Sequence, residues 1–179
     1  MTVAAYVRDA PVTRDEVEAR LAQVRSSALG ARLPHAATAE GRNARRWVTQ
    51  LVCAERLVDS ELGPADATAA LLTIERALGV GGVAAAVLAA RPDAARVVAA
   101  PVVDDADVRS YYDRNPDLYA DRGLGVDEAR DQIAAKLQAY ARDRAFGEWL
   151  DQNMARHVVL QPGFEHPADP HQADATHRH

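Results

Sequence analysis

The chain has 179 residues, of which 48% are hydrophobic and 26% charged, so its composition is that of one globular domain and not of a disordered segment. Its net charge of −5 leaves no basic excess to neutralise phosphates, which argues against a protein whose main task is nucleic-acid binding. Cys53 is the only cysteine, which excludes an internal disulfide and a cysteine-based zinc site, and its Leu- and Val-rich helical surroundings predict a buried, unreactive thiol.

The N-terminal residues predict a strand, a turn and then a helix. Residues Val3–Val7 are β-like, and Arg8–Pro11 is expected to be a turn. Thr13 stands three residues before Glu16, the spacing of a capping box, in which each side chain accepts a hydrogen bond from the other residue's backbone N–H. The apolar residues that follow are spaced as one helical stripe, and they are Val17, Leu21, Val24 and Ala28.

The middle of the chain predicts further helices separated by glycine and proline. Residues 30–43 are expected to form a loop, because they combine glycine, proline and polar side chains. A second helix is expected over Ala44–Leu62, where apolar residues recur at helical spacing. Shorter helical patterns follow at residues 64–77, 83–90 and 93–100.

Three arginines cluster near the start of the second helix. They are Arg42, Arg45 and Arg46, and Glu40 partly balances their charge. Because charged side chains on a helix are most often exposed, we interpret this small basic patch as a solvated face.

The C-terminal half predicts the longest helix of the chain. A short helix capped by Asp104 or Asp105 is expected to end at Asn115, and the longest helix is expected over Asp127–Arg156. Its apolar residues form two adjacent rows, so this helix should pack against more than one neighbour. The rows are Ile133, Leu137, Tyr140, Ala141, Ala145 and Trp149, and beside them Phe146, Leu150 and Met154.

The expected fold is mainly α, with one small β element. Val158–Leu160 is β-like and is expected to pair with Val3–Val7, so that a two-stranded element joins the termini. We therefore expect a single helical domain over residues 1–163, with the long helix as its spine. Residues 164–179 combine two prolines with mostly polar side chains and show no apolar period, which predicts a separate C-terminal tail.

The tail carries the strongest chemical signal in the sequence. Four of the six histidines, His166, His171, His177 and His179, lie in the last 14 residues. In an extended chain, residues two apart point the same way, so His177 and His179 could bind one ion, with the other two completing the shell. Such a set suits Zn, Cu, Ni or Fe. The alternative is a solvated tail that binds metal only incidentally.

Four segments resemble the parvulin-type foldases of the SurA and PrsA group. Val3–Val17 contains a strand, a turn and the sequence P-[IV]-T-x-x-E, with which those proteins open. Val103–Tyr119 is similar to the helix before their isomerase domain, and Asp127–Leu137 to the helix after it. His157–Leu160 is similar to their final strand. The resemblance implies a SurA-like helical scaffold of the chaperone type.

The isomerase domain of that family has no counterpart in this chain. Only a few residues lie between Tyr119 and Val126, where the whole domain would have to stand. The resemblance therefore implies a scaffold without prolyl isomerase activity, and it assigns no catalytic residue. The chain also resembles small actinobacterial proteins labelled malonyl transferases, but no serine stands in the G-x-S-x-G context that this acyl transfer needs.

Aromatic side chains suggest where a partner could bind. Trp47, Tyr111 and Tyr112 could line a groove for an apolar peptide, because such rings combine a large contact area with a polar group. The alternative is that they fill a core that is otherwise poor in large side chains. We favour the core for Trp149 and for at least one of the two tyrosines.

These observations leave three hypotheses about function. The first is a chaperone-like protein that binds a peptide or protein partner. The second is a metal-binding protein or metalloenzyme that uses the histidine-rich tail, and the third is a structural subunit of an assembly. The sequence shows no signal-peptide pattern and no run of about 18 apolar residues, so we expect a cytoplasmic protein without membrane or nucleic-acid partners.

Overall fold

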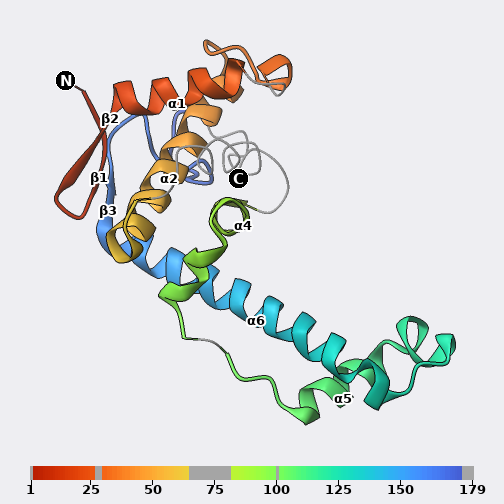
Figure 1. Ribbon diagram of the computed structural model, residues 1–179. Helices are drawn as coiled ribbons and strands as arrows, with labels where there is room; N and C mark the ends of the chain where they lie inside the picture. Colours follow the sequence, from red (N-terminus) through yellow and green to blue (C-terminus); the bar gives the residue numbers. More distant parts are fainter. Residues whose placement is uncertain (1, 27–29, 65–81, 100, 175–179) are drawn as a thin grey trace.

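The computed structural model of the chain describes residues 2–26, 30–64, 82–99 and 101–174, and it is mainly helical, as expected, with one small antiparallel sheet (Figure 1). The long helix α6 (Val126–His157) runs away from the sheet and carries the shorter helix α5 (Asp105–Arg114) at its far end. The helical pattern expected at residues 64–77 lies almost entirely outside the described residues.

The sheet has three strands, in the order β2-β1-β3. The expected pairing is confirmed, because β1 (Val3–Val7) lies antiparallel to β3 (Val158–Leu160). The expectation of only two strands is wrong, since Ala10–Thr13 forms β2, which pairs with the other edge of β1. The turn is confined to Arg8 and Asp9, and Pro11 is tolerated because β2 is an edge strand, where a missing N–H breaks no pairing.

Helix α1 (Arg14–Ser26) begins at the expected capping box. The Glu16 N–H donates to Thr13 Oγ1 at 3.2 Å, and the Thr13 N–H donates to Glu16 Oε2 at 3.3 Å. Its buried residues are Val17, Leu21 and Val24 of the predicted stripe. Ala28, the last member of that stripe, lies outside the described residues.

Helix α2 (Ala39–Leu62) starts five residues before the predicted position. Thr38 is its N-cap, with Oγ1 accepting a hydrogen bond from the Gly41 N–H at 3.1 Å. The predicted loop over residues 30–43 is therefore too long, because a threonine cap outweighed the low helix propensity of Gly41. The helix ends at Gly63, as its sequence indicates.

The chain continues through α4 (Gly82–Ala90), which confirms the expected short helix. The helix expected over residues 93–100 is instead a 3-10 helix at Pro92–Val97. Pro92 begins this element and supplies no N–H, and the segment is too short to build the repeated hydrogen bonds of an α-helix.

Two helices complete the fold. Helix α5 (Asp105–Arg114) has Asp104 as its N-cap, and α6 (Val126–His157) matches the predicted long helix within one residue at each end. One member of the predicted apolar row is misplaced, because the Tyr140 side chain is 59% exposed. It lies between the two parts of α6 that pack against other elements.

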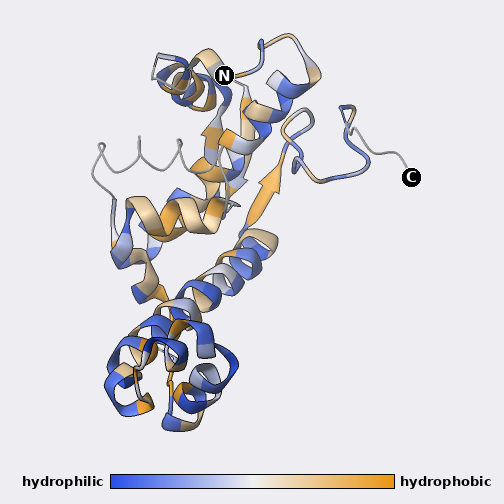
Figure 2. Cartoon of the chain, turned by 90° about the vertical axis from the view of Figure 1, so that its right-hand side faces the viewer, coloured by the Kyte–Doolittle hydropathy of each residue, from blue (hydrophilic) through white to orange (hydrophobic). Residues whose placement is uncertain are grey.

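The side chains of the described residues form two separate hydrophobic clusters. The larger one joins the sheet, α1, α2, α4 and the C-terminal half of α6, including Phe146 and Leu150. The smaller one, around Tyr119 and Ile133, joins α5 to the N-terminal half of α6. Helix α6 therefore packs against more than one neighbour, as predicted. Most residues of α5 and of the segments beside it are hydrophilic (Figure 2).

Within the described residues, no helix combines the length and apolar character that crossing a membrane requires. The cytoplasmic location expected from the sequence stays a prediction.

Candidate functional site

The chain beyond β3 returns across α2, and we call residues 161–174 the C-terminal strap. The strap contains turns but no helix or strand. Its start is fixed by the Gln161 N–H, which donates to the Ala4 carbonyl at 2.9 Å. Phe164 is only 7% exposed and packs into the larger hydrophobic cluster. The start of the strap is therefore packed against the sheet and the larger hydrophobic cluster.

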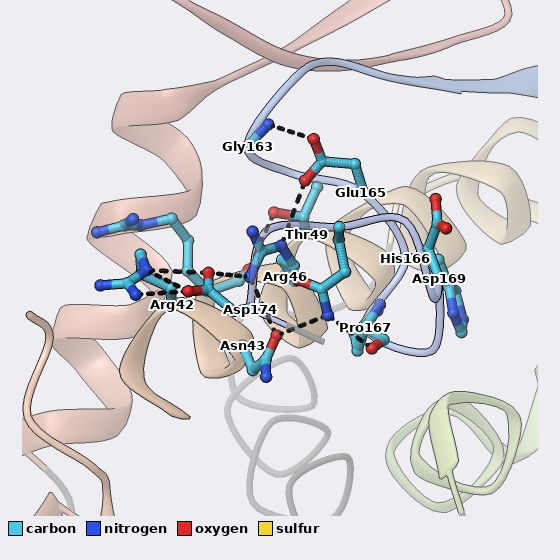
Figure 3. A network of polar contacts seen from close by, with 12 residues as sticks. Arg42, Asn43, Arg46, Thr49, Gly163, Glu165, His166, Pro167, Asp169 and Asp174 are labelled. Atoms are coloured by element: carbon cyan, nitrogen blue, oxygen red, sulfur yellow. Dashed lines mark hydrogen bonds and ion pairs between the residues drawn. The ribbon is translucent and has the colours of Figure 1, made fainter. Parts of the chain in front are cut away.

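The end of the strap is held by two arginines of α2 (Figure 3). Asp174 Oδ2 accepts from Arg46 Nη1 at 2.8 Å and from Arg42 Nε at 2.9 Å. Its Oδ1 accepts from Arg42 Nη2 at 2.5 Å. Arg46 Nε also donates to Glu165 Oε2 at 3.4 Å. Two carboxylates of the strap thus meet the guanidinium groups of α2.

Burial makes this network stronger than a surface ion pair. The side chains of Arg46 and Asp174 are 3% and 6% exposed, so water screens their attraction weakly. The hydrogen bonds from Arg42 and then Arg46 hold the pKa of Asp174 well below its usual range. Asp174 is therefore a carboxylate at neutral pH.

Amide side chains complete the polar network. Asn43 Oδ1 accepts from Arg46 Nη1 at 3.0 Å and from Gln172 Nε2 at 3.1 Å. Gln172 is 3% exposed, and its Nε2 also donates to the Pro167 carbonyl. The strap is thus folded on itself where it lies on α2.

The expectation that the arginine patch is a solvated face is wrong for Arg46. Its position in the helix places it under the strap, and the strap's carboxylates compensate the cost of removing its charge from water. Arg45 instead reaches α1, where Nε lies 2.6 Å from Glu18 Oε1. The sequence signal that could have found this site is the pairing of clustered arginines with a tail that carries separated carboxylates.

A pocket lies beside the strap, between α2, α4 and α6. Its volume is about 430 Å³, and it is lined mostly by apolar side chains. The lining residues are Trp47, Gln50, Gly82, Val83, Ala84, Leu150, Asp151, Met154 and His166. The His166 ring packs edge-on against the Trp47 ring, with their centroids 5.9 Å apart. The strap therefore forms one wall of the pocket through His166.

The three aromatic residues predicted to bind a peptide do not share one groove. Trp47 lines the pocket on α2, whereas Tyr111 and Tyr112 lie on α5, in the smaller cluster. There both rings pack against Tyr119, and the Tyr112 hydroxyl donates to the Leu124 carbonyl at 2.7 Å. The two tyrosines thus act as partly buried core residues, one of the alternatives given by the sequence.

Two of the four predicted metal ligands lie in the strap. His166 Nδ1 accepts a hydrogen bond from the Ala168 N–H at 3.1 Å, and the His171 backbone N–H donates to Asp169. His177 and His179 lie outside the described residues. In the part of the chain that is described, no three His, Cys, Asp or Glu side chains are grouped to hold a metal ion. The four-histidine site stays a prediction.

A second polar site lies between α1 and α2, in a cavity of about 330 Å³. Glu55 of α2 pairs there with Arg20 of α1, and their side chains are 20% and 18% exposed. Burial raises the pKa of Glu55 to about 7, against the opposing effect of the Arg20 charge. Burial likewise raises the pKa of Cys53 to about 12, which agrees with the unreactive thiol expected from the sequence.

Comparison with known proteins gives a match to part of the chain. The model of a family of unknown function (DUF7158) matches residues 3–40. This segment comprises β1, β2 and α1, and it ends before Arg42 and Arg46. No curated protein and no solved structure matches the chain. The resemblance to the parvulin-type foldases stays a prediction.

Proposed function

We propose that this chain is a chaperone-like scaffold that binds an apolar segment of a partner protein, without prolyl isomerase activity. The observation that carries the proposal is the pocket beside the strap. Its volume of about 430 Å³ lies within the range of pockets that take up side chains of a ligand.

The lining of the pocket suits an apolar side chain. Trp47 and Met154 are partly buried, and Leu150 forms part of the wall next to the core. A tryptophan provides a large rigid contact surface, while a methionine adapts its shape to different ligands. Asp151 and His166 are exposed polar residues at the same pocket, where they could contact the backbone of a bound segment.

The short connection between α5 and α6 supports the part of the proposal that excludes prolyl isomerase activity. Residues 120–122 form a single 3-10 turn, and Gly123 in the left-handed region leads to the start of α6 at Val126. This loop directly joins the two elements between which the resembling foldases carry their catalytic domain.

The proposal is tested by suppression of aggregation. The protein, with no metal added, is mixed with a chemically unfolded client, and light scattering follows aggregation as the denaturant is diluted. We expect suppression by the wild type. Trp47→Ala and Met154→Ser should each weaken it about tenfold or more, because truncating a central anchor residue costs a binding site on the order of 2 kcal/mol.

A matched control is Tyr140→Ala, which removes an exposed aromatic ring outside the pocket. This variant should suppress aggregation as the wild type does. Circular dichroism verifies that each variant is folded. Equal suppression by the wild type and both pocket variants, or no suppression by the wild type, contradicts the proposal.

A further inference from the structure

The contact between the strap and α2 is made by side chains. Among the described residues, every hydrogen bond between the two joins one side chain to another. Arg42 and Arg46 of α2 donate to Asp174, Arg46 also donates to Glu165, and Gln172 of the strap donates to Asn43. Beyond Gln161, the backbone hydrogen bonds described for the strap stay within it. The strap could therefore leave α2 without breaking any helix or strand.

The two ends of the strap are held differently. Phe164 packs in the larger hydrophobic cluster, so it is a fixed anchor. Asp174 is held by ionic hydrogen bonds to Arg46 and to Arg42, whose side chain is 43% exposed. Because water can reach Arg42 and compete for its hydrogen bonds, we expect the strap to open at the Asp174 end. Opening would also remove His166 from the ring of Trp47.

The surface beneath residues 165–174 has a defined chemistry. It presents two guanidinium groups, from Arg42 and Arg46, beside the apolar pocket that Trp47 lines. A buried guanidinium needs an anion beside it, so a protein segment that covers Arg46 in place of the strap should bring a negatively charged group, such as a carboxylate. The adjoining pocket favours an apolar side chain in the same ligand.

We propose that residues 165–174 are an intramolecular ligand. They occupy a surface that binds an extended segment of a partner protein, and this segment carries both a carboxylate and an apolar side chain. The inference rests on the proposed function, for which it names the class of partner segment. The partner's carboxylate takes the place of Asp174 on Arg42 and Arg46, and its apolar side chain enters the Trp47 pocket. The strap competes with the partner and keeps Arg46 paired when no partner is bound.

Competition by the strap reduces the apparent affinity for a partner. A tethered segment acts at an effective concentration on the order of millimolar, so it outcompetes a weak ligand in free solution. If the strap is closed in about 99% of molecules, the apparent dissociation constant rises about a hundredfold. Weakening the closed state should therefore tighten binding of a partner segment.

The test uses the full chain and a fluorescent peptide with the sequence of residues 164–174. We expect Asp174→Asn to bind this peptide about tenfold or more tighter than the wild type, because the tethered strap has lost its charge. Binding should weaken again when Arg42→Gln is added. The matched control is Arg45→Gln, which alters a neighbouring arginine that pairs with α1 and should leave peptide binding unchanged.

Two measurements keep the inference falsifiable. A peptide whose carboxylates are replaced by amides should not bind, and equal binding of both peptides overturns the proposal. In the wild type, hydrogen exchange should be faster in residues 165–174 than in α2. The proposal is also overturned if the amides of residues 165–174 and of α2 exchange only together, by global unfolding.

The outcomes separate this inference from the proposed function. An unfolded client that binds the wild type and Asp174→Asn equally well overturns the role of the strap and leaves the proposed function intact. Failure of both proteins to bind any client counts against the proposed function itself.

Discussion

Asp174 and Arg46 form an ion pair with an Oδ2–Nη1 distance of 2.8 Å, although 128 positions separate them in the sequence. Both side chains are almost completely buried, so each charge needs compensation from its ion-pair partners, to which Arg42 and Glu165 also contribute. The pair fastens the C-terminal strap to α2 beside the proposed binding pocket. It therefore links the stability of this region to the availability of the surface beneath the strap.

Asp174→Asn should lower the free energy of unfolding by about 2 kcal/mol, the size expected for losing hydrogen bonds to a charged group. The loss stays moderate because the strap can lift and let water reach Arg46. Urea denaturation followed by circular dichroism measures the change. Asp131→Asn, at a fully exposed position of α6, should change stability by less than about 0.5 kcal/mol. Equal stability of Asp174→Asn and the wild type would contradict the importance of the pair.

Glu55 should make the protein less stable as the pH rises through neutrality. Burial raises its pKa from 4.5 to about 7, so the folded chain keeps a proton that the unfolded chain releases between these values. Stability contributed by this proton is present below about pH 4.5 and is lost as the pH rises towards 7. We expect the urea midpoint to fall from pH 5 to pH 8, by an amount equivalent to about 2 kcal/mol for a shift of this size.

Glu55→Gln should remove most of this pH dependence, because the glutamine cannot release a proton. Glu148→Gln is the control, since Glu148 is 58% exposed and pairs only within α6. The control should keep the wild-type slope. The assignment is wrong if the slope between pH 5 and pH 8 is the same in Glu55→Gln and in the wild type.

Thr38→Ala should destabilise the protein by about 1 kcal/mol, the usual cost of losing an N-cap hydrogen bond. Thr38 is exposed, so this substitution leaves no cavity. Thr38→Ser keeps a hydroxyl oxygen for the Gly41 N–H and should restore nearly all of the stability. Thermal unfolding of the three proteins provides the comparison, and an unchanged Thr38→Ala midpoint would place the start of α2 elsewhere.

The metal hypothesis predicts that the protein, purified without an affinity tag, binds Zn²⁺ or Ni²⁺ with nanomolar affinity. The double variant His177→Ala with His179→Ala should lose most of the metal, because two of the four imidazoles are removed. His35→Ala is the control, since this histidine lies outside the tail. Elemental analysis and calorimetric titration measure the effect. No bound metal and no nanomolar uptake by the wild type would end this hypothesis.

Local patterns predicted the elements well where the sequence itself holds the determinants. The capping box at Thr13 correctly starts α1, Asp104 is one of the two caps expected for α5, and the apolar rows correctly predict α6. The start of α2 was misjudged, because Gly41 looks like a loop residue although Thr38 caps a helix there. Strand β2 was missed, because Ala10 and Pro11 were assigned to the turn, whereas their pairing with β1 makes them part of an edge strand.

The candidate site was predicted only in part. Trp47 was identified as a possible contact residue, and it does line a pocket. Tyr111 and Tyr112 were grouped with it on chemistry alone, but α6 keeps them in the other hydrophobic cluster. Arg46 was taken for a solvated residue, since nothing in its helix shows that a distant segment covers it.

The sequence by itself determined most of the described helices and the burial of Cys53, because these follow from apolar spacing and capping between near neighbours. The β-like runs at Val3–Val7 and Val158–Leu160 also indicated the strand pairing between them. Only the tertiary structure decided that the strap lies on α2 and that a pocket opens beside it. Ion pairs such as Asp174 with Arg46 join groups that are far apart in the chain, and their strength depends on burial. The burial of these charged side chains depends on which distant segment packs over them, so it could not be read from either segment alone.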